Sequence, residues 1–405
     1  MTNNLPLADV KILDLMWVMA GPAGTRILAD YGATIIRVES SQRIDTARTI
    51  QPFHGRKPGS DSSALFQNMN TGKLGITLDL NKEAGRAVVR DLVRWADVVT
   101  ESFSPKAMRT WGLDYESLRQ IKPDIIMLSS CLMGQTGPMA KFAGFGNLAA
   151  AISGFFNLTG WPDRPPAGPF GAYTDYVAPR FTAVAILAAL DHRRRTGQGQ
   201  YIDQSQAEST LHFLGPAILD YTANGGIQGP MGNRDLCMAP HGVYPAAGKD
   251  RWVAIAVETE EQWQSLCDIM QRPDLLHDER FATRAARLRH QDELDTQLAE
   301  WTKQQEPFQA ETILQARSIP ASAVSTLHEL HHDPQLVHRH HFVQLDHPTH
   351  GTTTVEGSRF QLSRTPAQIT RSAPTLGRDN QYVLGTILGY SEEQITELVA
   401  AGALE

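Results

Sequence analysis

Cysteine is scarce in the 405-residue sequence, and the few cysteines are far apart. Cys131, Cys237 and Cys267 form no C-x-x-C pair, which argues against a disulfide framework and against a structural zinc site. Positive charge is not in excess either, because 37 Lys and Arg residues face 44 Asp and Glu residues and the net charge is −7. Without a basic field, we expect no binding to nucleic acid or to an anionic membrane surface.

The sequence also lacks a long hydrophobic run. No stretch approaches the roughly 20 apolar residues that cross a membrane, and the first residues do not have the pattern of a signal peptide. We therefore expect a cytoplasmic protein without a membrane segment. Hydrophobic residues make up 41% and charged residues 20% of the chain, and its length allows two domains.

Short apolar segments alternate with helical patterns over the first part of the chain. Strands are predicted at 10–15, 33–39, 75–80, 97–103 and 124–130, with helices at 21–32 and 82–95. This alternation indicates an α/β fold with a largely parallel sheet covered by helices. Because ligands bind at the carboxyl ends of such strands, the loops at 17–22, 102–109 and 129–138 are the expected walls of a site.

The first strand, helix and strand superficially resemble a dinucleotide-binding unit. Glu39 ends the second strand, where a ribose-binding acid would stand, but the G-x-G-x-x-G spacing is absent. We therefore do not expect a nicotinamide site.

The composition changes after 203–221, a segment that is predicted to be helical. Residues 224–233 hold four glycines and one proline, which favours a loop and a domain boundary. A strand at 251–257 and helical patterns at 260–270, 284–305 and 307–317 follow, so a smaller α/β domain is predicted there.

Eight histidines lie between His328 and His350, and a metal site is the first alternative to consider. Adjacent histidines such as His331 and His332 point away from each other on a helix, and no H-E-x-x-H motif accompanies them. We therefore expect no metal.

Asp175 stands ahead of a long apolar helix. Pro179 suits the first turn of that helix, every residue from Ala183 to Leu190 is apolar, and a glycine-containing segment at 196–200 ends it. We expect this helix to be buried on most of its circumference. From this stretch alone, the simpler interpretation is that Asp175 caps the helix.

The same stretch resembles the catalytic segment of the class III CoA-transferases, the CaiB/BaiF family. The likeness rests on Asp175, the apolar helix and the R-x-T-G-x-G-Q block from Arg194 to Gln200, and it extends over the whole chain. Further landmarks occur in the family's order: Ala20-Gly21-Pro22, Asn70-Thr-Gly-Lys73, 101–105, 134–138, 159–166, 232–234, 239–244, 330–334 and 360–366.

This resemblance implies a Rossmann-like large domain with a parallel sheet and a smaller α/β domain, in chains that interlock as a homodimer. The implied domains are 1–222, the N-terminal part of the large domain, 223–327, the small domain, and 328–405, a linker and C-terminal part that return to the large domain.

The implied activity is transfer of CoA from an acyl-CoA thioester to a carboxylic acid, with Asp175 as the nucleophile. The aspartyl group forms first an anhydride and then an aspartyl-CoA thioester. Coenzyme A enters as a thioester substrate, so no tightly bound cofactor is expected.

The resemblance also places residues along the CoA channel. The resemblance implies that Trp17 to Met19 border the channel, that Ser102 and Phe103 hold the adenine side, and that Lys73 and Arg109 reach the phosphates. Some relatives carry His and Gln at the places of Trp17 and Met19, Asn at Ser102 and Arg at Ser40, so this chain departs from them there. The expected CoA-binding residues are Trp17, Val18, Met19, Lys73, Leu74, Ser102, Phe103 and Arg109.

Two alternatives share the fold. Racemases of the family use a histidine beside the aspartate, whereas this chain has Phe145-Gly146 at the aligned place, which favours a transferase. The chain could instead be a subunit of a heteromeric transferase. The presence of Asp175 argues only against a subunit that is catalytically silent. The acceptor is not identified, although Trp17, Phe145, Phe170 and Tyr173 favour a bulky or aromatic acid.

Overall fold

The computed structural model describes residues 5–405, which form two compact units. The first unit comprises the described residues up to Phe156, then Gly168–Ile227 and Val337–Glu405. The second unit comprises Asn157–Ala167 and Gln228–Leu336. Segment 157–167 joins the second unit although it precedes the glycine-rich loop that was expected to begin the small domain.

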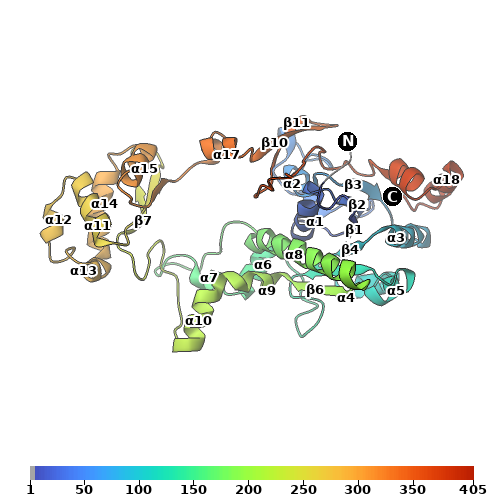
Figure 1. Ribbon diagram of the computed structural model, residues 1–405, viewed down its shortest axis with the longest axis horizontal. Helices are drawn as coiled ribbons and strands as arrows, with labels where there is room; N and C mark the ends of the chain where they lie inside the picture. The colour runs from blue at the N-terminus through green and yellow to red at the C-terminus, as the bar shows by residue number, and fades with distance from the viewer. Residues whose placement is uncertain (1–4) are drawn as a thin grey trace. The chain divides into compact units, whose positions relative to one another are not determined.

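A six-stranded parallel sheet forms the centre of the first unit (Figure 1). Its order is β3-β2-β1-β4-β5-β6, and every neighbouring pair is parallel. The predicted α/β class with a parallel sheet is therefore confirmed. The strands are β1 (Lys11–Leu15), β2 (Thr34–Glu39), β3 (Leu74–Thr77), β4 (Val98–Glu101), β5 (Ile126–Cys131) and β6 (Tyr201–Ser205).

Helices cover both faces of this sheet because successive strand residues point to opposite sides. Ile12 and Val98 pack toward α1 (Ala20–Asp30) and α8 (Tyr173–Thr196). Leu13 packs in the other core, which includes residues of α3 (Glu83–Trp95), α5 (Tyr115–Ile121) and α18 (Glu392–Ala400). The strand order reverses between β1 and β4, and the loops after these two strands diverge there as in other doubly wound sheets.

Three features in and after α8 differ from the sequence-based expectations. The segment 203–221 is not one helix, because its first residues belong to β6, which pairs with β5 as the sixth strand. Helix α8 begins at Tyr173, so Asp175 lies inside its first turn and not upstream of it. Only one side of α8 is buried, and Val184 and Leu187 are exposed although the whole run is apolar.

The end of the chain completes the open edge at β3. The Asp379 carboxylate accepts a hydrogen bond from the Gly75 N–H at 2.8 Å, and the Leu404 carbonyl accepts one from the Thr77 hydroxyl at 2.7 Å. The hairpin of β10 (Phe342–His347) and β11 (Gly351–Glu356) lies beside α2 (Ala64–Asn70). Residues 337–405 are thus an integral part of the first unit.

The second unit is built on a three-stranded antiparallel sheet, β7 (His241–Pro245), β8 (Trp252–Ala256) and β9 (Ala321–Ala323). Its core surrounds the buried Trp263 of α11 (Glu260–Ile269) and includes residues of α14 (Gln291–Thr302) and α15 (Pro307–Gln315). The predicted strand at 251–257 and the helices that follow it are present.

Short helices connect these elements. They are η1 (Thr46–Thr49), η2 (His54–Arg56), α4 (Pro105–Trp111), α6 (Gly146–Ile152), α7 (Phe155–Leu158), α9 (Gln206–Leu211), η3 (His212–Leu214), α10 (Gly215–Asn224), α12 (Asp274–His277), α13 (Arg284–Arg289), α16 (Leu327–Leu330), α17 (Pro334–His338) and η4 (Tyr382–Ile387).

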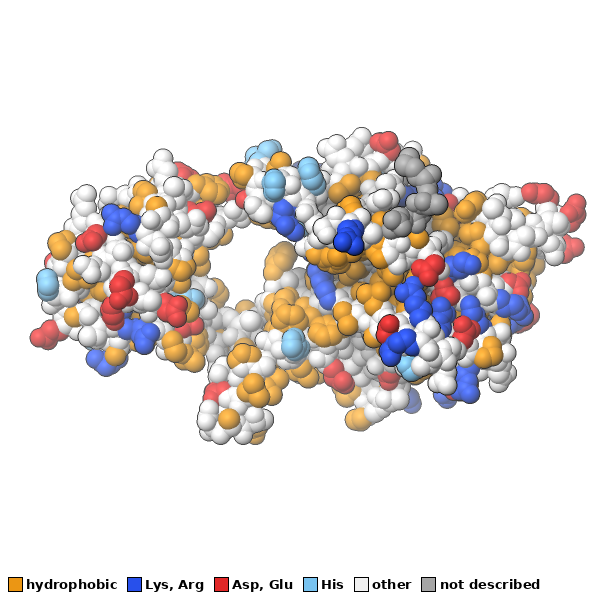
Figure 2. All heavy atoms as spheres, in the orientation of Figure 1, with side chains coloured by type: hydrophobic (Ala, Val, Ile, Leu, Met, Phe, Trp, Pro, Cys, Tyr) orange, Lys and Arg blue, Asp and Glu red, His pale blue; other side chains and the backbone are white. Residues whose placement is uncertain are grey.

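Within residues 5–405, no helix has the length and apolar character needed to cross a membrane. Hydrophobic side chains are nevertheless exposed in the first unit, including Leu219 and Tyr221 of α10. Figure 2 shows hydrophobic side chains at the surface over α10.

Candidate functional site

A cavity of about 790 Å³ lies in the first unit where the strand order reverses. This volume falls within the range of about 300–1,000 Å³ that is typical of ligand pockets. Residues that follow all six strands line it, including Trp17 after β1, Arg43 after β2, Ser102 after β4 and Gln206 after β6. The sheet therefore brings residues nearly two hundred positions apart in the sequence to one edge.

Asp175 is part of the cavity wall and is held from two directions. Its carboxylate accepts a hydrogen bond from the Gln206 side-chain N–H and another from the backbone N–H of Gly146. Gln206 also donates to the Thr174 hydroxyl at 2.8 Å, and that hydroxyl donates to the Gly146 carbonyl at 3.0 Å. The N-cap residue of α8 is Ala172, and no side chain caps the helix by a hydrogen bond. The interpretation that Asp175 caps the helix is therefore wrong.

Gly146 leaves just enough room for this carboxylate. A Cβ atom at position 146 would stand 2.8 Å from Cγ and 2.9 Å from both carboxylate oxygens of Asp175. Contacts between non-bonded heavy atoms are most favourable at about 3.5–4.0 Å. The absence of a side chain at position 146 is therefore what allows its N–H to approach Asp175.

Burial raises the pKa of Asp175, while the hydrogen bonds from Gln206 and Gly146 act in the opposite direction. Only 6% of Asp175 is exposed. A buried carboxylate with few hydrogen bonds is less solvated than a surface carboxylate, so it is a better nucleophile and a better base.

The loop after β1 carries the expected residues Trp17, Val18 and Met19 along the cavity. The Trp17 N–H donates to the Ser102 hydroxyl at 2.9 Å, which joins this loop to the one after β4. The Trp17 and Phe103 rings meet edge to face with their centroids 5.8 Å apart. Five of the eight expected CoA-binding residues, Trp17, Val18, Met19, Ser102 and Phe103, thus lie together.

The other three, Lys73, Leu74 and Arg109, are not among the lining residues. Lys73 is fully buried, and its ammonium group donates to Asp14, to Asn70 and to the Pro22 carbonyl, each at 2.9 Å. These three bonds use all of its N–H donors. Burial lowers the pKa of Lys73 to about 8, against the attraction of Asp14. Lys73 therefore joins parts of the fold, and none of its ammonium N–H donors remains for a phosphate.

The cations that do line the cavity are Arg43 and Lys141, which the sequence reasoning missed. The Arg43 guanidinium lies over the Trp17 ring, 5.6 Å from its centroid. The sequence signal that could have identified Arg43 is its position, because it is a cation shortly after the end of a predicted strand. Nothing in the sequence pattern singled out Gln206, because it follows a strand that was predicted as a helix.

Two carboxylates near the cavity, those of Glu39 and Glu101, accept hydrogen bonds from neighbouring groups. Glu39 accepts hydrogen bonds from the Arg48 guanidinium at 2.9 and 2.7 Å, so its carboxylate is engaged and the nicotinamide alternative gains no support. Burial raises the pKa of Glu101 to about 7, and its carboxylate accepts a hydrogen bond from the Phe103 N–H at 2.7 Å. Burial likewise raises the pKa of the nearby Cys131 thiol to about 12, so this thiol is not an activated nucleophile.

No histidine is among the described residues that line this cavity. Phe145, which is exposed and lines the cavity, and the adjacent Gly146 have no side chain that can transfer a proton. Across residues 5–405, no group of three or more His, Cys, Asp or Glu residues is arranged to hold a metal ion.

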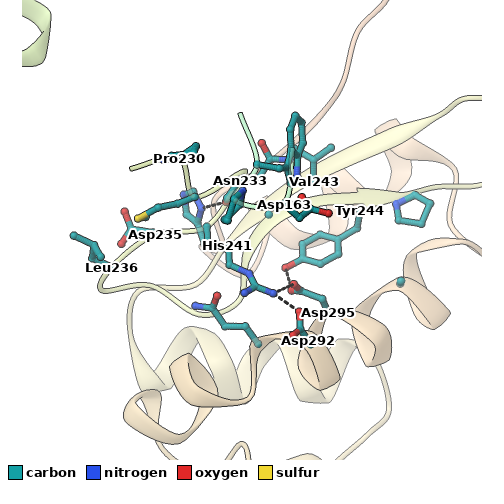
Figure 3. A pocket seen from close by; sticks show the side chains of 18 residues that line it. Asp163, Pro230, Asn233, Asp235, Leu236, His241, Val243, Tyr244, Asp292 and Asp295 are labelled. Atoms are coloured by element: carbon teal, nitrogen blue, oxygen red, sulfur yellow. Dashed lines mark hydrogen bonds and ion pairs between the residues drawn. The ribbon is translucent and has the colours of Figure 1, made fainter. Parts of the chain in front are cut away.

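A second cavity of about 710 Å³ lies within the second unit (Figure 3). Its Arg234 guanidinium pairs with Asp292 and lies 3.9 Å from Asp295. Asp295 also accepts a hydrogen bond from the Tyr244 hydroxyl at 2.8 Å. Asp163 and Asp235 line the cavity as well, so among the described lining residues the acidic groups outnumber the one arginine. This excess of negative charge makes the cavity a weaker candidate for binding an anionic substrate than the one at Asp175.

Comparison with known proteins places the chain in a family. The model of CoA-transferase family III matches residues 7–380. The succinyl-CoA–D-citramalate CoA-transferase of Chloroflexus aurantiacus is 34% identical over 395 residues, which are 98% of this chain and 97% of that protein. The succinate–glutarate CoA-transferase of Agrobacterium fabrum is 34% identical over 390 residues, which are 94% of this chain and 96% of that protein.

A solved structure and two subunits extend the comparison. The crystal structure of a CaiB/BaiF family protein from Brucella suis has a TM-score of 0.87 and 32% identity, covering 94% of this chain and 99% of its own. The alpha and beta subunits of a Chloroflexus aurantiacus succinyl-CoA–L-malate CoA-transferase are each 30% identical over 98% of this chain, covering 92% and 98% of their own lengths. The chain therefore belongs to CoA-transferase family III, the CaiB/BaiF family, and is an enzyme that transfers CoA between acyl-CoA thioesters and carboxylic acids.

Proposed function

We propose that Asp175 is the nucleophile of this CoA-transferase. The observation that carries the proposal is its placement: a buried carboxylate on the wall of the cavity, oriented by Gln206 and Gly146. Burial raises its pKa, and its exposed fraction of 6% restricts access by water, which would hydrolyse an anhydride.

In the proposed reaction, a carboxylate oxygen of Asp175 attacks the carbonyl carbon of the donor thioester. The C–S bond breaks, CoA leaves as a thiolate, and a mixed anhydride forms. The thiolate then attacks the aspartyl carbonyl carbon, which releases the donor acid as a carboxylate and forms an aspartyl-CoA thioester. The acceptor carboxylate reverses this sequence: it forms a second anhydride, from which the thiolate takes the acceptor acyl group and frees Asp175.

We propose that the CoA portion lies along the loops that carry Trp17, Val18, Met19, Ser102 and Phe103. The aromatic surfaces of Trp17 and Phe103 suit an adenine ring, and Arg43 and Lys141 supply positive charge for phosphates. Arg43 and Lys141 take the place of Lys73 and Arg109 in this proposal.

The acceptor is proposed to be a carboxylic acid with an apolar portion. Of the four aromatic residues expected near the acceptor, Trp17 and Phe145 line the cavity, whereas Phe170 and Tyr173 are not among its lining residues. The exposed Phe145 favours a bulky acid over formate or oxalate. A panel of acids, including succinate, glutarate, oxalate and phenylacetate, offered with one acyl-CoA donor tests this. Exclusive use of small polar acids would contradict it.

We also propose the interlocked homodimer of a Rossmann-like fold that the family resemblance implies. The exposed apolar side chains of α8 and α10, including Val184, Leu187 and Leu219, are suited to burial in such an assembly. Sedimentation equilibrium of the purified chain at micromolar concentration should show a dimer. A monomer that becomes active only after a related chain is added would favour the heteromeric alternative, in line with the two-subunit relatives.

Replacement of Asp175 tests the nucleophile. Asp175→Asn should abolish CoA transfer while the melting temperature stays close to that of the wild type, because a reacting group is lost and the side chain keeps its size. Asp191→Asn is a matched control on the same helix, since Asp191 is exposed and pairs only with Arg195 among the contacts described for it. It should leave transfer unchanged.

Chemical trapping gives an independent test. After incubation with acyl-CoA, borohydride or hydroxylamine should modify the peptide that contains Asp175, because only an activated aspartyl carbonyl reacts. Transfer near the wild-type rate in Asp175→Asn, or a label on another carboxylate, would show that the nucleophile lies elsewhere.

A further inference from the structure

The loop after β1 contains a valine in an unusual backbone conformation. Val18 has φ 66°, in the left-handed region that β-branched residues rarely adopt. Such conformations persist only where the surrounding structure holds them, and they are concentrated at functional sites. Val18 lines the cavity between Trp17 and Met19, so this strain lies within the proposed CoA-binding wall.

The group that holds Val18 is the buried carboxylate of Asp45. The Val18 N–H donates to both oxygens of Asp45, at 3.0 and 3.2 Å. Asp45 is inaccessible to solvent and pairs with the Arg37 guanidinium, which is equally buried. Arg37 in turn donates to the Met16 carbonyl at 2.6 Å. The Asp45–Arg37 pair therefore binds the loop backbone on both sides of Trp17.

Asp45 also fixes the loop after β2. Its Oδ1 atom accepts a hydrogen bond from the Ala47 N–H at 2.9 Å at the start of η1. The adjoining residues Arg43 and Ile44 line the cavity, and Arg43 lies over the Trp17 ring. One carboxylate therefore joins two walls of the cavity, although Asp45 itself is not among the residues that line it.

We propose that Asp45, supported by Arg37, is a positioning residue for acyl-CoA binding. It holds Val18 in the left-handed conformation and thereby keeps Trp17 and Arg43 in the arrangement that receives the CoA portion. This inference rests on the proposed place of CoA in the cavity. The role needs a carboxylate, because an asparagine at position 45 would offer one acceptor oxygen to three donors and direct its own N–H groups at one of them.

The expected consequence is a change in substrate binding more than in turnover. If loss of the carboxylate reduces the fraction of enzyme with an ordered loop to about one tenth, the apparent affinity falls about tenfold. Asp45→Asn should therefore raise the KM for acyl-CoA and the Kd for free CoA about tenfold, with kcat within about threefold of the wild type once substrate has ordered the loop.

A second substitution separates positioning from general stability. Glycine adopts positive φ without steric cost, so Val18→Gly removes the strain that Asp45 has to hold. The loss of CoA affinity caused by Asp45→Asn should consequently be smaller in the Val18→Gly background than in the wild-type background. Equal losses in the two backgrounds would overturn the inference.

A matched control is available in the second unit, where Glu260 pairs with the buried Arg287 at 2.9 Å. Glu260→Gln should lower the melting temperature and leave the KM unchanged. The same KM increase in this variant would show that any loss of stability weakens binding, and would overturn the role of Asp45.

Hydrogen exchange of the wild-type enzyme tests the inference without any substitution, and so covers the case in which Asp45→Asn does not fold. The Val18 amide should be protected in the absence of CoA because its partner is buried; rapid exchange at Val18 would overturn the inference. Failure of the proposed function is recognisable separately, because Asp175 would then carry no label whatever the behaviour of Val18.

Discussion

The contact between Gly146 and Asp175 leads to a sharp prediction. Glycine at the first position of α6 has no positive φ to maintain, so alanine fits the backbone there. Gly→Ala within a helix ordinarily stabilises a protein by about 0.5–1 kcal/mol. At position 146, however, the new Cβ would stand 2.8 Å from Cγ of Asp175.

The size of the effect follows from this distance. Restoring an ordinary contact of about 3.5–4.0 Å requires a displacement of roughly 0.7–1.2 Å, and overpacking of this kind costs about 1–3 kcal/mol. Misplacement of a reacting group by about 1 Å lowers the rate about 10²-fold. We therefore expect Gly146→Ala to lower kcat about a hundredfold, together with a reduction in stability of about 1–2 kcal/mol.

Steady-state kinetics and urea unfolding of Gly146→Ala measure the two effects. Gly215→Ala is the control, because a Cβ at the start of α10 meets no atom within 4 Å. That variant should keep both activity and stability. If Gly146→Ala is as active and as stable as the control, Asp175 either is not constrained by Gly146 or is not the reacting group.

Three further predictions concern buried polar groups. Gln206→Leu removes a hydrogen bond that lowers the pKa of Asp175, so the acid limb of the kcat/KM profile should move to higher pH. Burial raises the pKa of Glu101 from 4.5 to about 7, so the folded chain keeps a proton that the unfolded chain releases, and stability should fall by roughly 3 kcal/mol as the pH rises through this window. In Glu101→Gln, unfolding in urea at several pH values should show no such fall. Lys73→Met leaves the buried Asp14 unpaired and should lower the free energy of unfolding by about 3–5 kcal/mol, with an unchanged KM for acyl-CoA.

Each of these predictions has a contrary outcome. An unshifted acid limb in Gln206→Leu would mean that the group titrating in the profile is not Asp175. A Glu101→Gln variant with the pH dependence of the wild type would place the raised pKa on another group. A raised KM with unchanged stability in Lys73→Met would restore the phosphate-binding role that the sequence suggested for Lys73.

The sheet was predictable because its strands are apolar and short, and because Gly32 and Gly197 mark the ends of α1 and α8 between them. The strand β6 was not, since Tyr201–Ser205 contains one β-branched residue and becomes a strand through pairing with β5. Predicted site residues that directly follow strands, such as Trp17 and Ser102, line the cavity. Lys73 does not line it, and sequence position does not reveal that Asp14 and Asn70 occupy its ammonium group.

The same limit applies to the groups that hold Asp175 and Val18. Gln206 reaches Asp175 from 31 residues away, and Asp45 reaches the Val18 N–H from 27 residues away. Neither contact has a periodic pattern, and only the assembled sheet edge brings the partners together. The exposed side of α8 was missed for a related reason, because an apolar run does not say which of its faces a neighbour covers.

The closure of the β3 edge by Asp379 and Leu404 bears on the order in which the chain folds during its synthesis. The partners of Gly75 and Thr77 lie more than 300 residues further along the sequence. The ribosome has therefore made all six sheet strands and the whole second unit before the first unit can close its edge. Until then β3 presents unpaired backbone groups, so the nascent chain carries an open sheet edge that is available for pairing with other chains.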